Sequence, residues 1–89
     1  MDTEWKLFAN LAEAVDARSV DVSVDGGDAT VRDALDALVT AHPALEPLVL
    51  EDGELQGHVN LLRNGEPASL DDDLAAGDEL AIFPPVTGG

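Results

Sequence analysis

Residues 77–89 of the chain read GDELAIFPPVTGG, and this stretch decides how the rest of the sequence is interpreted. Residues 79–83 are mostly apolar and read as a buried strand, which ends at the following prolines because proline cannot donate to a ladder. Each proline also biases the residue before it toward extended backbone. Residues 86–89 are therefore predicted to project as a tail that reaches about 13 to 14 Å.

The end of this tail points to the terminal carboxylate of Gly89 as the reactive group. Gly88 and Gly89 carry no Cβ, so they can pass through a channel too narrow for other residues. The competing interpretation is an ordinary frayed terminus, because chain ends are often disordered. The predicted organisation is one folded domain over residues 1–83 and an extended tail over residues 84–89.

The composition predicts a single small domain. The chain has 89 residues, of which 45% are hydrophobic, enough for one core and too few for a second domain. It contains no cysteine, which excludes disulfides, thiolate metal sites and a cysteine nucleophile. The start lacks the features of a signal peptide, and no apolar run approaches a membrane span. We therefore expect a cytoplasmic protein that does not associate with membranes.

The charge is strongly one-sided. Nineteen acidic residues oppose four basic ones, for a formal net charge of −15. This charge excludes nucleic-acid binding through a basic patch. The acids are spread along the whole chain, and at molar salt their repulsion is screened within ~3 Å. The pattern favours adaptation to a salt-rich cytoplasm, as in halophilic archaea, over an acidic surface built for a basic partner.

The first half of the chain predicts two strands and two helices. Residues 5–9 read as a mostly buried, central strand, and Asn10 is a good N-cap for a short helix. Residues 20–24 alternate valine with acidic or polar residues, which predicts a half-buried strand. Thr30 and Asp33 form a capping-box pattern, and apolar residues then recur at helical spacing until His42-Pro43. This second helix is the main one.

The second half is predicted less completely. Residues 44–50 suggest a short helical turn before an acidic loop at 51–54, and the sequence leaves strand boundaries between 44 and 58 open. Residues 58–62 read as a strand that the Asn64-Gly65 turn connects to a short segment near 66–70. Residues 71–73 are three aspartates and predict a solvated turn before the last strand.

Motifs for catalysis are lacking. His42 and His58 are the two histidines, and without cysteine or H-E-x-x-H spacing they predict no zinc site. The acidic runs lack the ligand spacing of a calcium loop, and their polarity gives no sign of the burial that acid-base catalysis needs. Gly26-Gly27 lies in no nucleotide-binding motif and reads as a turn. We expect a protein that is not an enzyme and binds no metal or cofactor.

Four segments carry a resemblance: residues 5–13, 31–43, 59–65 and, most specifically, 77–89 with the pattern G-D-E-x-A-x-F-P-P-V-x-G-G. In these segments the chain resembles the ubiquitin-like small archaeal modifier proteins and the sulfur-carrier small subunit of molybdopterin synthase. The resemblance implies an α+β fold of the ubiquitin-like β-grasp type. Its mixed sheet would have four to five strands, with the first and last strands parallel at the centre and the main helix across one face.

The resemblance also implies a mechanism. An adenylyltransferase like the ubiquitin-activating enzyme would use ATP and Mg²⁺ to convert the Gly89 carboxylate to an acyl-adenylate. A sulfur donor would then give a thiocarboxylate, used with the molybdopterin synthase large subunit or for tRNA thiolation, or lysines of target proteins would form isopeptide bonds. The implied tail and docking residues are Gly88, Thr87, Val86, Pro85, Pro84 and Phe83.

Some alternatives stay open from the sequence. It does not choose between sulfur carriage and protein conjugation, or between molybdopterin and tRNA as sulfur acceptor. A non-covalent acidic protein-binding domain, with no C-terminal chemistry, is the alternative function.

Lys6 is the sole lysine and alternates with Trp5 and Leu7, so its amine is predicted on the opposite face of the strand, available for self-conjugation. The protein alone is expected to be a monomer.

Overall fold

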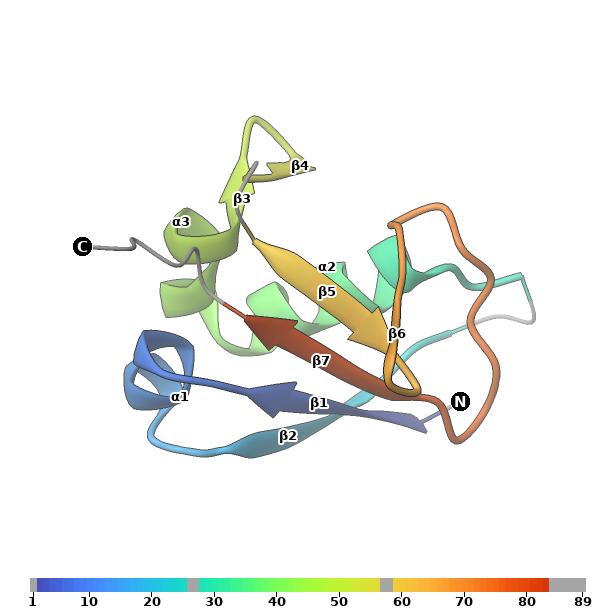
Figure 1. Cartoon of the computed structure of the whole chain (residues 1–89), viewed down its shortest axis with the longest axis horizontal. Coiled ribbons are helices and arrows are strands. Elements are labelled where there is room, and N and C mark those ends of the chain that lie inside the picture. The colour runs from blue at the N-terminus through green and yellow to red at the C-terminus, as the bar shows by residue number, and fades with distance from the viewer. Residues whose placement is uncertain (1, 26–27, 57–58, 84–89) are drawn as a thin grey trace.

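The first and last strands, β1 (Asp2–Leu7) and β7 (Glu79–Phe83), lie side by side and parallel inside a five-stranded sheet (Figure 1). The computed structural model describes residues 2–25, 28–56 and 59–83. The strand order is β2-β1-β7-β5-β6, with β2 (Ser19–Ser23), β5 (Asn60–Arg63) and β6 (Glu66–Pro67) paired antiparallel to their neighbours. This mixed sheet confirms the predicted β-grasp arrangement.

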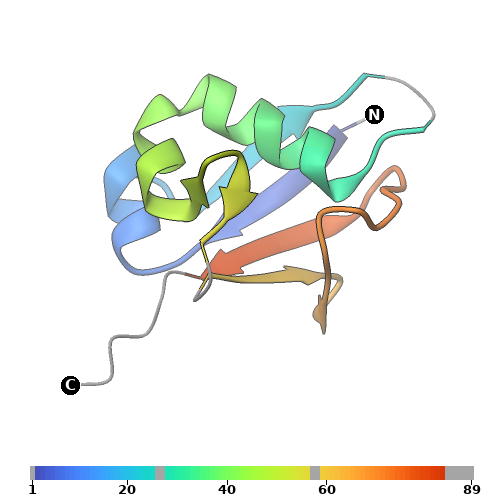
Figure 2. The ribbon, with the colours of Figure 1, turned by 90° about the horizontal axis from the view of Figure 1, so that it is seen from above.

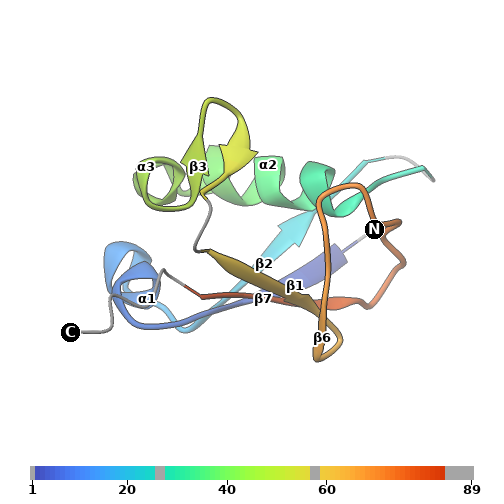
Figure 3. The same ribbon diagram turned by 45° about the horizontal axis from the view of Figure 1, so that its top comes forward.

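The helices cover one face of this sheet (Figures 2 and 3). The main helix, α2 (Val31–Ala41), crosses that face, and the short helix α1 (Asn10–Val15) lies at the end of the sheet where β7 finishes. A 3₁₀ turn, η1 (Pro43–Leu45), leads from α2 into α3 (Glu46–Val49). In the described part of the chain no helix packs on the opposite face, which we call the open face.

The main helix begins and packs as its sequence predicts. The Thr30 N–H donates to the Asp33 carboxylate at 2.9 Å in a complete capping box, so a backbone donor at the helix start is satisfied. The buried face of α2 packs on Trp5, whose indole N–H donates to the Ala34 carbonyl at 3.2 Å. This hydrogen bond lets a fully buried tryptophan satisfy its one polar group. The buried residues of α2 are Val31, Ala34, Leu35, Leu38 and Val39.

The prediction that Asn10 caps the first helix is wrong by one position. Asn10 is the first helical residue, and Ala9 occupies the cap with no side-chain hydrogen bond. Ala9 has φ 52° and ψ −128°, a backbone conformation that suits glycine better than alanine. The sharp turn at Ala9, rather than a side-chain cap, therefore begins α1.

The predicted acidic loop at residues 51–54 is instead a hairpin. Its strands are β3 (Leu50–Glu51) and β4 (Glu54–Leu55), which form a separate two-stranded sheet. The turn residues Asp52 and Gly53 have φ 53° and 80°, as a tight hairpin turn requires. The preceding helical turn, by contrast, is confirmed by η1 and α3.

The aspartates at 71–73 are more than a solvated turn. The Val31 N–H donates to the Asp72 carbonyl at 2.9 Å, and Thr30 forms a β-bridge with Asp73. The segment therefore contacts the start of α2. Strand β5 begins at Asn60 rather than at the predicted residue 58, and His58 itself lies outside the described residues, as do Gly26 and Gly27.

Candidate functional site

The open face of the sheet carries an apolar strip close to the point where the tail begins. Along β7, Leu80 and Ile82 are buried beneath α2, so Ala81 between them faces the open side. Leu62 of β5 and Lys6 of β1 are the register partners of Ala81 and share its face. The face is thus apolar at Ala81 and Leu62, whereas Lys6 of β1 and Glu79 at the start of β7 place charges on it.

Two aromatic rings complete this strip. Phe8, directly after β1, and Phe83, the last residue of β7, stack with ring centroids 4.3 Å apart and planes 18° from parallel. Phe8 is 39% exposed and is the exposed large hydrophobic residue of the described chain. We call Phe8, Leu62, Ala81 and Phe83 the open-face patch. Phe8 is exposed and the other three are half-buried, and aromatic and aliphatic side chains grouped in this way at the surface are typical of protein interaction sites.

The local backbone sets the direction of Phe8. β1 ends at Leu7, and the sharp turn at Ala9, where φ is positive, sends the chain into α1 immediately afterwards. Phe8 therefore stays next to Phe83 rather than following the helix. The strained conformation at Ala9 is held in place by contacts on both sides, because the Leu7 N–H donates to the Arg18 carbonyl at 2.8 Å and the Glu13 N–H to the Ala9 carbonyl at 3.2 Å.

Lys6 lies where the sequence predicts. Its neighbours Trp5 and Leu7 are buried, whereas the Lys6 ammonium reaches the open face and pairs with Glu79 at 3.6 Å. Both side chains are about half exposed, at 45% and 51%, so the pair contributes little to stability. The amine is accessible to a partner in this position.

Of the tail residues singled out from the sequence, Phe83 is described by the structure. The others lie outside the described residues: Pro84, Pro85, Val86, Thr87, Gly88 and Gly89. Phe83 ends β7 beside Phe8, so the chain enters the tail next to the open-face patch. The patch and the origin of the tail therefore belong to one end of the sheet.

A buried carboxylate, not expected from the sequence, fixes the other end of β7. Asp78 is 8% exposed and accepts hydrogen bonds from the Ala75 N–H at 2.8 Å and the Asn64 side-chain amide at 2.9 Å. The Arg63 guanidinium lies 3.5 Å away. Burial is the largest influence and by itself raises the pKa of Asp78, but these hydrogen bonds and Arg63 together lower the pKa below its ordinary value.

This cluster ties β7 to the β5–β6 turn. The Asn64 side-chain oxygen accepts from the Glu79 N–H at 3.0 Å, and the Asn64 N–H donates to the Glu79 carbonyl at 2.7 Å. The Asp78 cluster lies at the opposite end of the strand from Phe83, so its role is structural.

The described residues hold no group of three or more histidine, cysteine or acidic side chains placed to bind a metal ion, and none of their helices has the length and hydropathy needed to cross a membrane.

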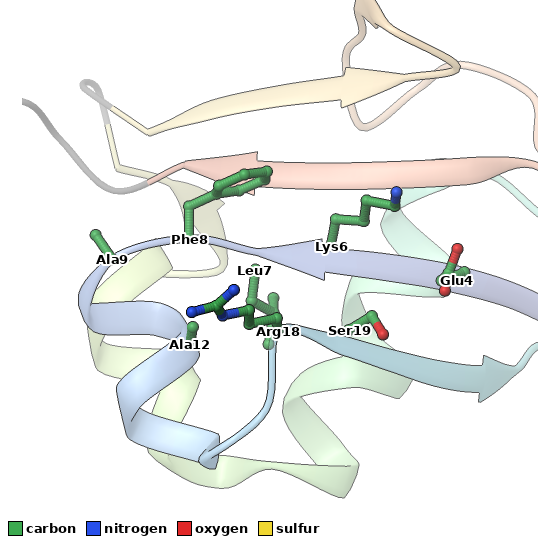
Figure 4. Close-up of a pocket in the computed structure, with 8 residues that line it drawn as sticks. All are labelled: Glu4, Lys6, Leu7, Phe8, Ala9, Ala12, Arg18 and Ser19. Carbon is green, nitrogen blue, oxygen red and sulfur yellow. The ribbon is translucent and has the colours of Figure 1, made fainter.

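A hollow of about 610 Å³ adjoins the open-face patch (Figure 4). Phe8 borders both features. Arg18, in the connection between α1 and β2, extends its guanidinium toward Ala12 of α1, while Lys6 extends toward β7. The hollow is lined by Glu4, Lys6, Phe8, Ala12, Arg18 and Ser19, among others.

Known proteins are similar to this chain in both sequence and fold. The ThiS family model matches residues 5–89. The chain is 68% identical over 87 residues to small archaeal modifier protein 1 of Haloferax volcanii, covering 97% of this chain and 99% of that one. It is 40% identical over 83 residues to the molybdopterin synthase sulfur carrier subunit of Escherichia coli, covering 93% and 94%. A crystal structure of the Haloferax volcanii modifier superposes with a TM-score of 0.91 at 63% identity over the whole of both chains.

Proposed function

The chain belongs to the ThiS family, and from this premise we propose that it is a ubiquitin-like protein modifier and sulfur carrier that is activated at Gly89. The observation that carries the proposal is the match to a modifier and to a sulfur carrier along nearly the full chain, through a family model that extends to residue 89. The open-face patch beside the start of the tail supports the proposal, since a partner that binds the tail would contact this patch.

The proposed chemistry needs activation because a carboxylate is a poor acyl donor. A Gly89 carboxylate oxygen attacks the α-phosphorus of ATP, whose charge Mg²⁺ offsets, and pyrophosphate leaves. The product is an acyl-adenylate with AMP as a good leaving group. In this role the chain is the substrate of an adenylyltransferase, and the protein itself supplies only the tail and the surface that positions it.

Two products follow from the same intermediate. A persulfide displaces AMP to give an acyl disulfide. A thiol then attacks the outer sulfur of this disulfide and forms a new disulfide with it, which releases the Gly89 thiocarboxylate as sulfur donor for molybdopterin or tRNA. Alternatively a lysine ε-amine of a target protein displaces AMP, loses its proton and forms an isopeptide bond. The modifier relative favours conjugation, and the sulfur-carrier relative favours sulfur transfer with a molybdopterin synthase large subunit. We therefore propose both roles for this chain.

The open-face patch is the proposed docking surface. Phe8 and Phe83 offer stacked rings at one end of the sheet, and Leu62 and Ala81 extend the apolar area along it. The tail, residues 84–89, follows Phe83 directly in the sequence. An enzyme that docks on the patch would therefore receive the tail at the same time. In this arrangement the acidic remainder of the surface stays in solvent.

Mass spectrometry of lysate from the source organism tests the proposal. The intact protein should include a form in which sulfur replaces one oxygen, located at Gly89. Conjugates need a protease chosen for this sequence, because the last basic residue is Arg63 and trypsin would leave residues 64–89 on the target lysine. A glutamate-specific protease cuts after Glu79, so residues 80–89 should be found attached to lysines.

A deletion of Gly88 and Gly89 is the matched control. The truncated chain should keep its fold, because the tail lies beyond the last strand, and it should yield neither adenylate nor conjugate. A chain extended beyond Gly89 by one alanine should also be inactive. Conjugates that persist in the truncated chain would contradict the proposal and favour a non-covalent binding domain.

A further inference from the structure

The basic residues of this acidic chain differ in whether they have a partner. Every one of its 19 acidic side chains falls within the described residues. Arg18 alone among the four basic residues has no carboxylate within 4.0 Å in the described ranges, and its guanidinium makes no hydrogen bond there. The ion pairs of the other three are Lys6–Glu79 at 3.6 Å, Arg32–Glu54 at 3.9 Å and Arg63–Asp78 at 3.5 Å.

The position of Arg18 gives this difference a meaning. Its guanidinium lines the hollow that shares Phe8 with the open-face patch (Figure 4). The backbone there is fixed, because the Arg18 carbonyl accepts the Leu7 N–H at 2.8 Å. An exposed cation on a rigid connection beside a docking surface is poised to bind an anionic group that arrives with the partner.

The chemistry of guanidinium narrows the choice of anion. Arginine presents five donors in a planar fork that matches a carboxylate or a phosphate in two parallel hydrogen bonds. The nucleotide phosphate of the activation step reacts at Gly89, six residues beyond Phe83. An extended tail of that length reaches roughly 20 Å at ~3.3 Å per residue. A carboxylate on the surface of the docked enzyme is therefore the better match for Arg18.

We propose that Arg18 binds an aspartate or glutamate side chain of the adenylating enzyme, so that the cation without an ion pair among the described residues sets the orientation of docking. The inference rests on the proposed function, because it names the activating enzyme as the partner. The enzyme's carboxylate enters the hollow beside Phe8 and accepts two hydrogen bonds from the guanidinium. A rotated orientation that brings the same carboxylate against acidic residues of this chain is disfavoured, because like charges repel.

The test is the kinetics of ATP–pyrophosphate exchange with the full-length chain and its cognate adenylating enzyme, in molar potassium chloride. Arg18→Glu should raise the KM for the chain at least ~10-fold while kcat stays within about twofold, because a pair is replaced by two facing carboxylates. The control is Arg32→Glu, which makes the same change in net charge on α2 and should leave KM near the wild-type value. Melting temperatures of both variants establish that they are folded.

Two further measurements identify the anion that Arg18 binds. The KM for ATP should be unchanged by Arg18→Glu, since the nucleotide does not contact this residue. Acidic residues of the enzyme near the docked patch are then changed singly to arginine, and one such variant should restore the activity of the Arg18→Glu chain.

The outcomes test the role of Arg18 and the proposed function separately. Equal KM values for Arg18→Glu and Arg32→Glu overturn the role of Arg18 while leaving the proposed function intact. A raised KM for ATP, or the lack of any rescuing enzyme variant, overturns the assignment of a protein carboxylate. Failure of the wild-type chain to support exchange refutes the proposed function, and the inference with it.

Discussion

Replacing Asp78 by asparagine should destabilise the fold more than any other single acid-to-amide change. The Asp78 side chain is 9% exposed, and its two oxygens accept from the Ala75 N–H and the Asn64 side-chain amide, with Arg63 beside them. Asparagine has nearly the same shape but only one oxygen. One of these donors must then face the new amide N–H₂ group, and Arg63 loses its counter-charge.

The magnitude follows from these contacts. Asp78→Asn loses one hydrogen bond to a charged group and leaves one buried donor without an acceptor. Together these changes lower the free energy of unfolding by about 2–3 kcal/mol. A chain of 89 residues has a total unfolding free energy of roughly 4–13 kcal/mol. For a domain of this size, a change of 2–3 kcal/mol lowers the melting temperature by roughly 8–24 °C.

Urea denaturation in molar potassium chloride measures this effect. Trp5 is the single tryptophan and is fully buried against α2, so its fluorescence reports unfolding. Asp71→Asn is the control, because Asp71 is exposed and lies in the turn before β7. A loss below about 0.5 kcal/mol in Asp78→Asn, equal to that of the control, would refute the structural role of the cluster.

The pH dependence supplies a second check. The folded pKa of Asp78 is lowered, so its contribution is complete above the unfolded pKa of about 3.9 and is lost as the pH falls through the folded value. The free-energy difference between wild type and Asp78→Asn should therefore be constant from pH 7 to about 4.5 and shrink only below ~3.9. A difference that already declines between pH 7 and 5 would show that another group is responsible.

Three further predictions concern salt, conjugation and backbone strain. The melting temperature should rise steeply from dilute buffer to molar potassium chloride as repulsion within the net charge of −15 is screened, and a flat profile would count against halophilic adaptation. Conjugates should be dominated by single attachments, since Lys6 is the sole lysine; abundant ladders on a blot of wild type that vanish in Lys6→Arg would overturn this. Ala9→Gly should raise the unfolding free energy by about 1 kcal/mol, because φ 52° with ψ −128° strains alanine, whereas a loss in a urea titration would contradict the reading of strain.

Local patterns predicted most of the secondary structure. The capping box of Thr30 and Asp33 and the helical spacing after it identified α2, because both depend on residues within a few positions of each other. The Asn64-Gly65 turn is confirmed by φ values of 53° and 84°. The Asp52-Gly53 pair carries the same kind of signal, and a hairpin could have been predicted there from the dipeptide alone.

Contacts between distant residues explain what the sequence left out. Asp78 and Asn64 meet only once β7 lies beside β5, so nothing near Asp78 in the sequence marks it as buried. Phe83 was expected to dock on partners, but its stacking on Phe8 depends on the parallel pairing of the two end strands. The absence of a counter-ion for Arg18 likewise becomes visible only when the described acidic side chains are placed in space.

The parallel pairing of β1 and β7 also determines how the molecule bears mechanical load. Tension applied between the two chain ends pulls the start of β1 and the finish of β7 in opposite directions along the strand axis. The backbone hydrogen bonds of residues 4–7 with residues 79–82 are then sheared together, whereas in a hairpin pulled at its open end they would separate one at a time. When the tail is anchored in another protein and the start of β1 is pulled, the β1–β7 ladder therefore resists as a unit and breaks as a unit.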